Sequence, residues 1–315
     1  MNPLLTRLKT ELHKAVIGQE AMIEGILIAL LCEGHVLIEG VPGLAKTTTV
    51  NALAKALGLD FKRIQFTPDL LPSDLLGTQV YNPKTQEFFI KKGPMFTHLL
   101  LADEINRAPA KVQSALLEAM QERQITIADK TFALTRPFMV LATQNPVEQE
   151  GVYPLPEAQL DRFMMKLVVT HNSEEEELAI MQKAATKSFA PVTTVITAEE
   201  LERLWKELEG VHVDDEVARY IVSLIAATRK PEAYGVPHLN EALRYGASPR
   251  ASIDMYKAAR AQALLRGKDY VTPGDIAAVA PAVLRHRLVL SYEARAKGIS
   301  PDALTADLLE HVPTP

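Results

Sequence analysis

A glycine-rich octet at residues 40–47 constrains the fold of this chain more than any other stretch. The octet reads Gly40-Val41-Pro42-Gly43-Leu44-Ala45-Lys46-Thr47. An apolar run at 35–38 precedes it and a helical pattern over 48–57 follows it, which predicts a strand, a tight loop and a helix. In that arrangement, successive backbone N–H groups of the loop and the helix N-terminus point at one spot and favour an anion there. The alternative is an ordinary glycine–proline turn between a strand and a helix.

The last residues of the octet suit the phosphates of a nucleotide. Lys46 adds a point charge for the β- and γ-phosphates, and the Thr47 hydroxyl has the size and the place to ligate Mg²⁺. Ala45 stands where the general pattern G-x-x-x-x-G-K-[ST] carries glycine. If that position requires a positive φ angle, alanine costs roughly 1–2 kcal/mol there. We predict that the octet and Thr48 bind nucleotide phosphates.

Apolar runs alternate with helical patterns through the first 170 residues. Strands are expected at 35–39, 61–66, 97–102, 137–143 and 163–170, and helices near 4–15, 20–33, 48–57 and 109–122. This alternation predicts a doubly wound α/β sheet with helices on its faces. Hairpins at 78–91 and 124–134 are expected as insertions in that sheet. Pro68 and Pro72 are expected to disrupt regular structure ahead of the first hairpin.

Helical patterns replace strands after about residue 170. Helices are expected at 174–187, 198–209, 214–228, 249–266 and 272–287. Good N-cap residues precede them: Ser173, Thr197, Asp214, Ser248 and Thr272. We therefore predict two domains, 1–170 and 171–315, of which the second is a small all-helical bundle. The cluster Arg285-His286-Arg287 is expected to form the C-terminal turn of the last of these helices.

Charge and composition argue against several classes of protein. The net charge of −5 and the lack of a long lysine or arginine stripe argue against a dedicated nucleic-acid surface. No stretch approaches the roughly 18 apolar residues of a membrane span. The single cysteine, Cys32, excludes an internal disulfide and favours a cytoplasmic location. No histidine pair has metal-site spacing, so Mg²⁺ brought by ATP is the only metal that we expect.

Two adjacent carboxylates follow the apolar strand Leu99-Leu100-Leu101-Ala102. The carboxyl ends of the strands are where α/β sheets bind ligands. Asp103 can hold the Mg²⁺ shell, and Glu104 can orient and activate an attacking water. A solvated strand end is the alternative, and the phosphate loop earlier in the chain makes that alternative weak.

Two other positions are candidates for the same site. Asn145 follows the strand at 137–143, and its amide can both donate and accept while positioning water or the γ-phosphate. Turn initiation before Pro146 is the alternative for Asn145. The break Val16-Ile17-Gly18, between the first two expected helices, could place Ile17 against a nucleotide base, although its position alone favours a plain turn.

Two arginines are candidates for phosphate contacts. Arg250 lies at the expected start of a helix, where a cation is locally unfavourable unless it meets an anion. Arg162 lies just before the last expected strand, and a surface salt bridge is its alternative role.

Several motifs, taken together and in order, resemble the MoxR family of AAA+ ATPases. They are the octet at 40–47, Asp103-Glu104-Ile105-Asn106-Arg107, Ala142-Thr143-Gln144-Asn145-Pro146 and Leu160-Asp161-Arg162-Phe163. The stretch at 65–74 matches as well, so that the resemblance covers nearly the whole chain. Ala45 is usual in this family and does not weaken the resemblance.

This resemblance implies an AAA+ P-loop NTPase core with a parallel sheet flanked by helices, followed by a C-terminal all-helical lid domain. The two hairpins correspond to the family's helix-2 insertion and pre-sensor hairpin. A ring, usually a hexamer, would hold ATP between its subunits.

The resemblance also implies roles for individual residues. Arg162 would be the arginine finger that reaches a neighbour's γ-phosphate. Asn145 would be sensor 1, and Arg250 would be sensor 2 within a subunit or across the interface. Gln65 resembles the residue that can hold the catalytic glutamate inactive, and Arg107 is a further candidate for a contact with a neighbour.

The leading functional hypothesis is a Mg²⁺-dependent ATP hydrolase that remodels or assembles protein clients as a chaperone-like factor. Members of the family often act with partners that carry von Willebrand A domains. A nucleotide-gated scaffold and a chelatase-type motor subunit are alternatives. A nucleic-acid motor, with Lys91 and Lys92 touching phosphates at a hairpin base, is disfavoured by the acidic net charge.

Overall fold

The computed structural model describes residues 2–146 and 151–315. A five-stranded parallel sheet in the order β2-β5-β8-β1-β9 forms its centre, as the alternating pattern predicts. The strands are β1 Val36–Glu39, β2 Phe61–Gln65, β5 Leu99–Asp103, β8 Met139–Gln144 and β9 Met165–Val168. The order shows that β1, which leads into the octet, lies between β8 and β9.

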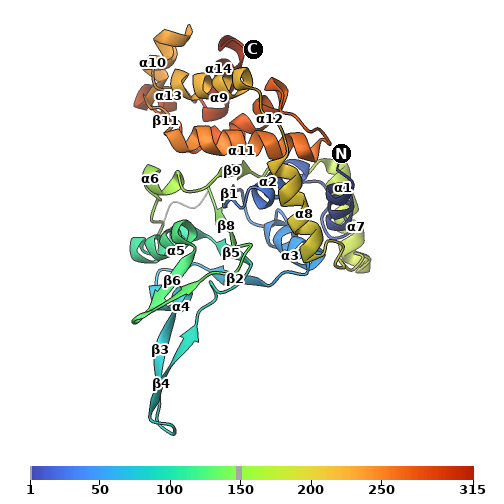
Figure 1. Cartoon of the computed structure of the whole chain (residues 1–315), viewed down its shortest axis with the longest axis vertical. Helices are drawn as coiled ribbons and strands as arrows, with labels where there is room; N and C mark the ends of the chain where they lie inside the picture. Colours follow the sequence, from blue (N-terminus) through green and yellow to red (C-terminus); the bar gives the residue numbers. More distant parts are fainter. Residues whose placement is uncertain (1, 147–150) are drawn as a thin grey trace.

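Helices cover both faces of this sheet (Figure 1). They are α1 Pro3–Leu12, α2 Glu20–Leu31, α3 Lys46–Leu57 and α5 Ala110–Glu122. Val36 and Ile38 of β1 join the apolar cluster that includes α1, α2 and α3, whereas Leu37 joins the cluster that includes α5. Successive side chains of a strand point to opposite faces. The inner strands β1, β5 and β8 are buried on both faces and therefore need the continuous apolar runs that the sequence carries, whereas the edge strand β2 exposes Lys62 and Arg63.

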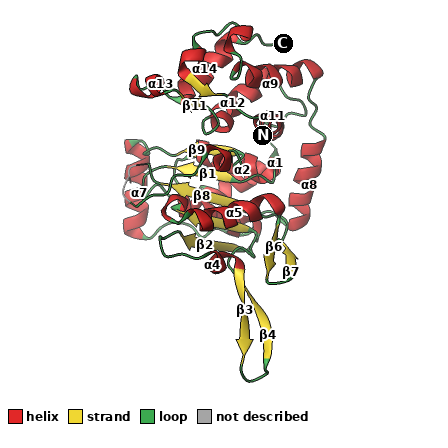
Figure 2. Cartoon of the chain, turned by 90° about the vertical axis from the view of Figure 1, so that its left-hand side faces the viewer, coloured by secondary structure: helices red, strands yellow, loops and turns green. Residues whose placement is uncertain are grey.

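Both expected hairpins are present, and the first projects far from the core (Figures 1 and 2). The first consists of β3 Gly77–Asn82 and β4 Glu87–Lys92, and the second of β6 Gln124–Ile127 and β7 Lys130–Ala133. The expectation that Pro72 disrupts regular structure is wrong, because Pro72 begins the short helix α4 Pro72–Leu76. Proline is tolerated in the first turn of a helix, where its missing N–H has no intrahelical partner.

The C-terminal part of the chain is helical, with one short antiparallel ladder added. The short helix α6 Glu157–Leu160 still belongs to the sheet region, because it lies between β8 and β9 in the chain. The helices after β9 are α7 Glu174–Thr186, α8 Ala198–Glu209, α9 Asp215–Ala227, η2 Pro231–Tyr234, α10 Leu239–Ala242, α11 Pro249–Leu265, α12 Pro273–Leu284, α13 Tyr292–Ala296 and α14 Pro301–His311. The ladder pairs β10 Leu243–Tyr245 with β11 Val289–Leu290. Four of the expected caps, Ser173, Thr197, Asp214 and Ser248, accept backbone N–H bonds at their helix starts.

The helical part packs directly on the sheet core. Trp205 of α8 donates its indole N–H to the Leu30 carbonyl of α2 at 3.4 Å, and the Cys32 thiol reaches the Lys257 carbonyl of α11 at 3.3 Å. One apolar cluster runs from the α1–α3 face of the sheet into α9, α11 and α12. In the ranges 2–146 and 151–315, no helix combines the length and the apolar character needed to cross a membrane.

Candidate nucleotide-binding site

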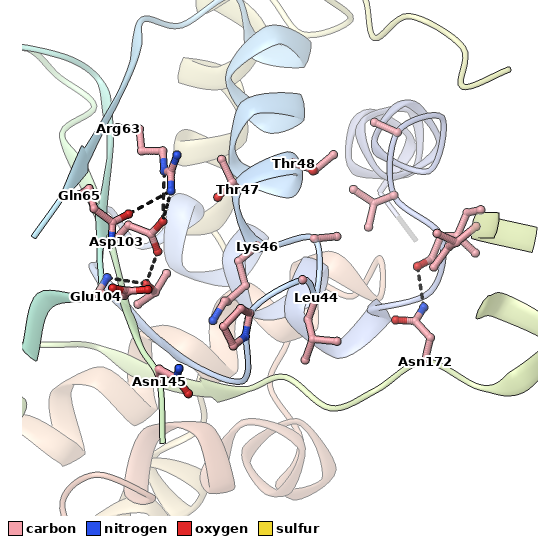
Figure 3. A pocket seen from close by; sticks show the side chains of 18 of the residues that line it. Leu44, Lys46, Thr47, Thr48, Arg63, Gln65, Asp103, Glu104, Asn145 and Asn172 are labelled. Atoms are coloured by element: carbon pink, nitrogen blue, oxygen red, sulfur yellow. Dashed lines mark hydrogen bonds and ion pairs between the residues drawn. The ribbon is translucent and has the colours of Figure 1, made fainter. Parts of the chain in front are cut away.

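A cavity of about 720 Å³ opens at the carboxyl ends of the strands, beside the octet (Figure 3). Its walls bring together segments that are far apart in the sequence: the loop, β2, the ends of β5 and β8, the turn after α1, and α7. Of the site residues expected from the sequence, those that line it are Ile17, Pro42, Gly43, Leu44, Ala45, Lys46, Thr47, Thr48, Asp103, Glu104 and Asn145.

The octet forms a strained loop that leads into α3. Ala45 holds a left-handed conformation, with φ 56° and ψ 14°, and it is the residue immediately before the helix. The conditional strain expected for alanine therefore applies, at roughly 1–2 kcal/mol. Gly40 must be glycine for a different reason, since a Cβ there would lie 2.8 Å from the Val169 carbonyl oxygen.

Lys46 is the first residue of α3, and its side chain extends back along the loop. Its ammonium donates to the Gly40 carbonyl at 2.6 Å. Partial burial lowers the pKa of Lys46, and the carboxylates of Asp103 and Glu104 act in the opposite direction. The ammonium and the N-terminus of α3 together place positive potential where a phosphate would lie.

Asp103 accepts hydrogen bonds on both carboxylate oxygens. Thr143 Oγ1 donates to Oδ1 at 2.5 Å, and Arg63 donates to Oδ2 from Nη2 at 2.6 Å and from Nε at 3.1 Å. Arg63 Nη2 also donates to Gln65 Oε1 at 3.1 Å. The Asp103 carboxylate and the Thr47 hydroxyl both line the cavity, and such oxygen ligands fit a hard cation such as Mg²⁺.

Arg63, Thr143 and Asn172 are polar residues of this site that were not predicted from the sequence. Arg63 becomes a partner of Asp103 only through the pairing of β2 with β5, which sets Gln65 opposite Asp103. A charged residue two positions before Gln65, and so on the same strand face, is the signal that could have revealed it.

Glu104 also lies in a left-handed conformation, with φ 56° and ψ 51°. Its backbone N–H donates to Thr143 Oγ1 at 2.8 Å, so that one buried threonine ties both carboxylate residues to β8. Its carboxylate pairs with Arg107 Nε at 3.0 Å within the chain. Gln65, the residue expected to hold the catalytic glutamate inactive, lines the same cavity as Glu104, and its amide oxygen accepts from Arg63.

The opposite end of the cavity is apolar and suits a nucleotide base. Asn172 holds this end together by donating to the Ile17 carbonyl at 2.9 Å and accepting from Gln19 at 2.7 Å. Ile180 of α7 and Phe189 complete the lining. Figure 3 shows Asp103 and Glu104 on one side of Lys46 and Asn172 on the other. The place of Ile180 in this lining could not be predicted from the sequence, because α7 buries no residue and its apolar pattern is weak.

Arg162 and Arg250 do not line this cavity. They lie together in a separate hollow of about 250 Å³, beside Asp161 and Asp254. Arg162 donates to the Leu117 carbonyl of α5 at 3.1 Å, and Arg250 is exposed in the first turn of α11. The structure therefore brings the two arginines to each other but not to the phosphate loop of their own chain.

The cluster at 285–287 lies at the end of α12, as expected, but it is more than a helix terminus. Arg285 forms a bidentate pair with Asp302, at 2.8 and 2.9 Å. Arg287 has a side chain only 1% exposed and pairs with Asp161 and Asp254. His286 is buried against the Phe163 carbonyl, and burial lowers its pKa well below the usual value.

Metal-ligating residues do not form a separate cluster in the described chain. No group of three or more His, Cys, Asp or Glu side chains in residues 2–146 and 151–315 has the geometry to hold a metal ion. Thr47 and Asp103, with the nucleotide, stay the predicted ligands of Mg²⁺.

Known proteins with similar sequences agree with this geometry. The model of the ATPase family associated with various cellular activities (AAA) matches residues 35–165, and that of the AAA lid domain matches residues 238–308. Sheet, phosphate loop and helical lid thus define an AAA ATPase. A crystal structure of a candidate ATPase from Cytophaga hutchinsonii superposes with a TM-score of 0.93 at 49% identity, over 98% of this chain and 94% of that one.

Curated relatives give the family. Chaperone MoxR1 of Mycobacterium tuberculosis is 48% identical over 99% of this chain and 82% of its own length. Protein MoxR of Methylorubrum extorquens is 30% identical over 98% of this chain and 94% of its own length. The chain belongs to the MoxR family of AAA+ ATPases.

Proposed function

We propose that this chain is a Mg²⁺-dependent ATP hydrolase whose turnover remodels or assembles protein clients, and that its ATP lies between the subunits of a ring. The observation that carries the proposal is the split arrangement of the site. Lys46, Asp103 and Glu104 share one cavity, whereas Arg162 and Arg250 share another hollow. A second copy of the chain could bring such arginines to the cavity of the first.

Each side chain in the cavity has a distinct task in this proposal. The N–H groups of the loop and the Lys46 ammonium hold the phosphates. Glu104 orients the attacking water and accepts its proton, and the Asn145 amide holds the water or the γ-phosphate in line. Mg²⁺, held through Thr47 and Asp103, would neutralise charge on the phosphate oxygens when bound. Arg162 and Arg250 of a neighbour would stabilise the charge that develops in the transition state.

Cellular setting and partners complete the proposal. We place the protein in the cytoplasm as a hexamer that acts on a protein client, with a partner carrying a von Willebrand A domain. The name of its relative Chaperone MoxR1 supports a chaperone-like role. A nucleotide-gated scaffold, in which ATP binding alone sets the assembly, is the second candidate. The ion pair between Arg107 and Glu104 would suit slow turnover, because it engages the carboxylate that would activate water.

The test is ATP hydrolysis by Glu104→Gln. The variant keeps the size of the side chain but removes the carboxylate that accepts the proton, so its kcat should fall by about a hundredfold or more while ATP still binds. Glu118→Gln, at an exposed position on α5, is the matched control and should turn over normally. Undiminished hydrolysis by Glu104→Gln would overturn the assigned mechanism. A Glu104→Gln form that still completes client assembly would favour the scaffold.

A further inference from the structure

The Arg287 guanidinium donates hydrogen bonds to several segments at the base of the lid. Its Nη1 donates to the Met164 carbonyl at 3.1 Å and to the Val283 carbonyl at 2.9 Å. Its Nη2 donates to the Phe163 carbonyl at 3.0 Å and to Asp254 Oδ2 at 2.5 Å. The remaining nitrogen, Nε, donates to Asp161 Oδ1 at 2.7 Å. One buried guanidinium thus fixes α11, the end of α12 and the start of β9 relative to one another.

Asp161 connects this guanidinium to both candidate arginines. It is the C-cap residue of α6 and directly precedes Arg162. Its second oxygen, Oδ2, accepts from the Ser248 hydroxyl at 2.8 Å. Ser248 is the N-cap of α11 and accepts from the Arg250 backbone N–H at 3.2 Å. A continuous series of hydrogen bonds therefore runs from Arg287 through Asp161 and Ser248 to the backbone that carries Arg250.

A role in stability alone is a weak explanation for this arrangement. A buried ion pair gains little over well-packed apolar residues of the same volume, because both charges lose their hydration. What it does supply is geometry, since a planar guanidinium accepts few orientations of its partners. The geometry fixed here is that of the two short segments that present Arg162 and Arg250 to the hollow they share.

We propose that Arg287, acting through Asp161 and Ser248, is a positioning residue for Arg162 and Arg250. The position of the lid then determines the orientation of both arginine side chains together. The inference rests on the proposed function, in which these arginines act on ATP held by a neighbouring copy. It adds that the turn after α12 carries a residue needed for catalysis at the neighbour's site although that residue touches no nucleotide.

The position of Asp161 outside the nucleotide cavity makes the inference testable by mixing. Asp161→Asn keeps the size of the side chain but loses the charge that holds Arg287, and Ser248→Ala breaks the second step. Each variant should bind ATP with unchanged affinity and lose about ten- to hundredfold in kcat, because small misplacements of catalytic groups have effects of that size. Asp302→Asn, which breaks the neighbouring Arg285 pair, is the matched control and should keep its kcat.

The deciding measurement mixes each variant with Glu104→Gln subunits. Those subunits have an inactive site of their own but intact arginines, so they should restore hydrolysis at the sound sites of Asp161→Asn or Ser248→Ala neighbours. A mixture that gives only the sum of its components would show a local defect and overturn the inference. Thermal unfolding shows whether each variant folds. If Asp161→Asn does not fold, Ser248→Ala decides the outcome.

A parallel mixture of Arg162→Ala with Glu104→Gln separates this inference from the proposed function. If Arg162→Ala is not restored either, arginine action between copies is wrong and both proposals fall. If Arg162→Ala is restored but the Asp161 and Ser248 variants keep full activity alone, or are not restored, only the positioning role is wrong.

Discussion

At the scale of single residues, the nucleotide site contains two strained positions. Ala45 and Glu104 both have φ 56°, a region that residues with side chains rarely adopt. Their surroundings hold them there: the Ala45 carbonyl accepts from Thr49 N at 2.8 Å and from its hydroxyl at 2.9 Å, and Thr143 holds Glu104. Strain of this kind persists where neighbouring contacts over-determine the backbone, and it concentrates at functional sites.

The first prediction concerns Ala45. Glycine tolerates a positive φ angle, so Ala45→Gly should raise the free energy of unfolding by about 0.5–1 kcal/mol, the strain relieved less the entropy that glycine loses. Urea unfolding measures the change. Ala115→Gly, in the middle of α5, should lower the free energy of unfolding by about 1 kcal/mol and so gives the opposite sign. Equal losses in the two variants would show that Ala45 is not strained.

At the scale of elements, the sequence predicts those whose signals are local. The apolar strands, the Ser173 and Thr197 caps and the turns of both hairpins act within a few residues, and each element lies close to its expected range. Unpredicted elements include α4, α6, η2, α10, α13, β10–β11 and α14. All but α14 are of five residues or fewer, a length at which packing rather than propensity forms the segment. The eleven-residue α14 had local signals, an N-cap serine and Pro301, that were not used.

The same distinction holds within the candidate site. The octet, Asp103, Glu104 and Asn145 could be predicted because they follow strands whose carboxyl ends must meet at one edge. The Arg63 and Thr143 contacts with Asp103 depend on strand register, which is a tertiary property. The role of Arg287 depends on three segments meeting, which no periodicity encodes.

A prediction at this scale concerns His35, which joins β1 to two neighbouring elements. The Val140 N–H donates to its Nδ1 at 3.0 Å, so its Nε2–H donates to the Met120 carbonyl at 3.1 Å. Burial lowers the pKa of His35 from 6.5 to about 4. Between these values the unfolded chain binds a proton that the folded chain does not. The stability that His35 supplies is therefore full above pH 6.5 and is lost as the pH falls toward 4.

The free energy of unfolding should accordingly fall by about 1.4 kcal/mol per pH unit in that window for each such histidine. Buried His286 adds a contribution of the same sign. Urea titrations from pH 7.5 to 5 should show that His35→Gln is less stable than the wild type at pH 7.5. Its free energy of unfolding should change less steeply with pH, by up to about 1.4 kcal/mol per pH unit, which corresponds to one proton. Equal slopes in the wild type and the variant would contradict the assignment.

At the scale of the whole molecule, one chain carries two incomplete halves of the proposed active site. The cavity with Lys46 and Glu104 and the hollow with Arg162 and Arg250 are separate in the structure. In the proposed ring, each copy would supply phosphate binding to one ATP and arginines to another. The Arg287 contacts would then link lid position to the neighbour's chemistry, so that hydrolysis at one site responds to the conformation of the next copy.

This arrangement leads to a prediction about assembly. A ligand that binds between copies stabilises their association, because it favours the associated form over separate subunits. ATP with Mg²⁺ should therefore lower the concentration at which the oligomer forms, as measured by native mass spectrometry over a dilution series. Lys46→Ala, which removes the phosphate contact, should lose the response to ATP, whereas Lys111→Ala, exposed on α5, should keep it. If the wild type stays monomeric at every concentration while binding ATP, each copy holds its nucleotide alone, and the arginine hollow must serve another purpose.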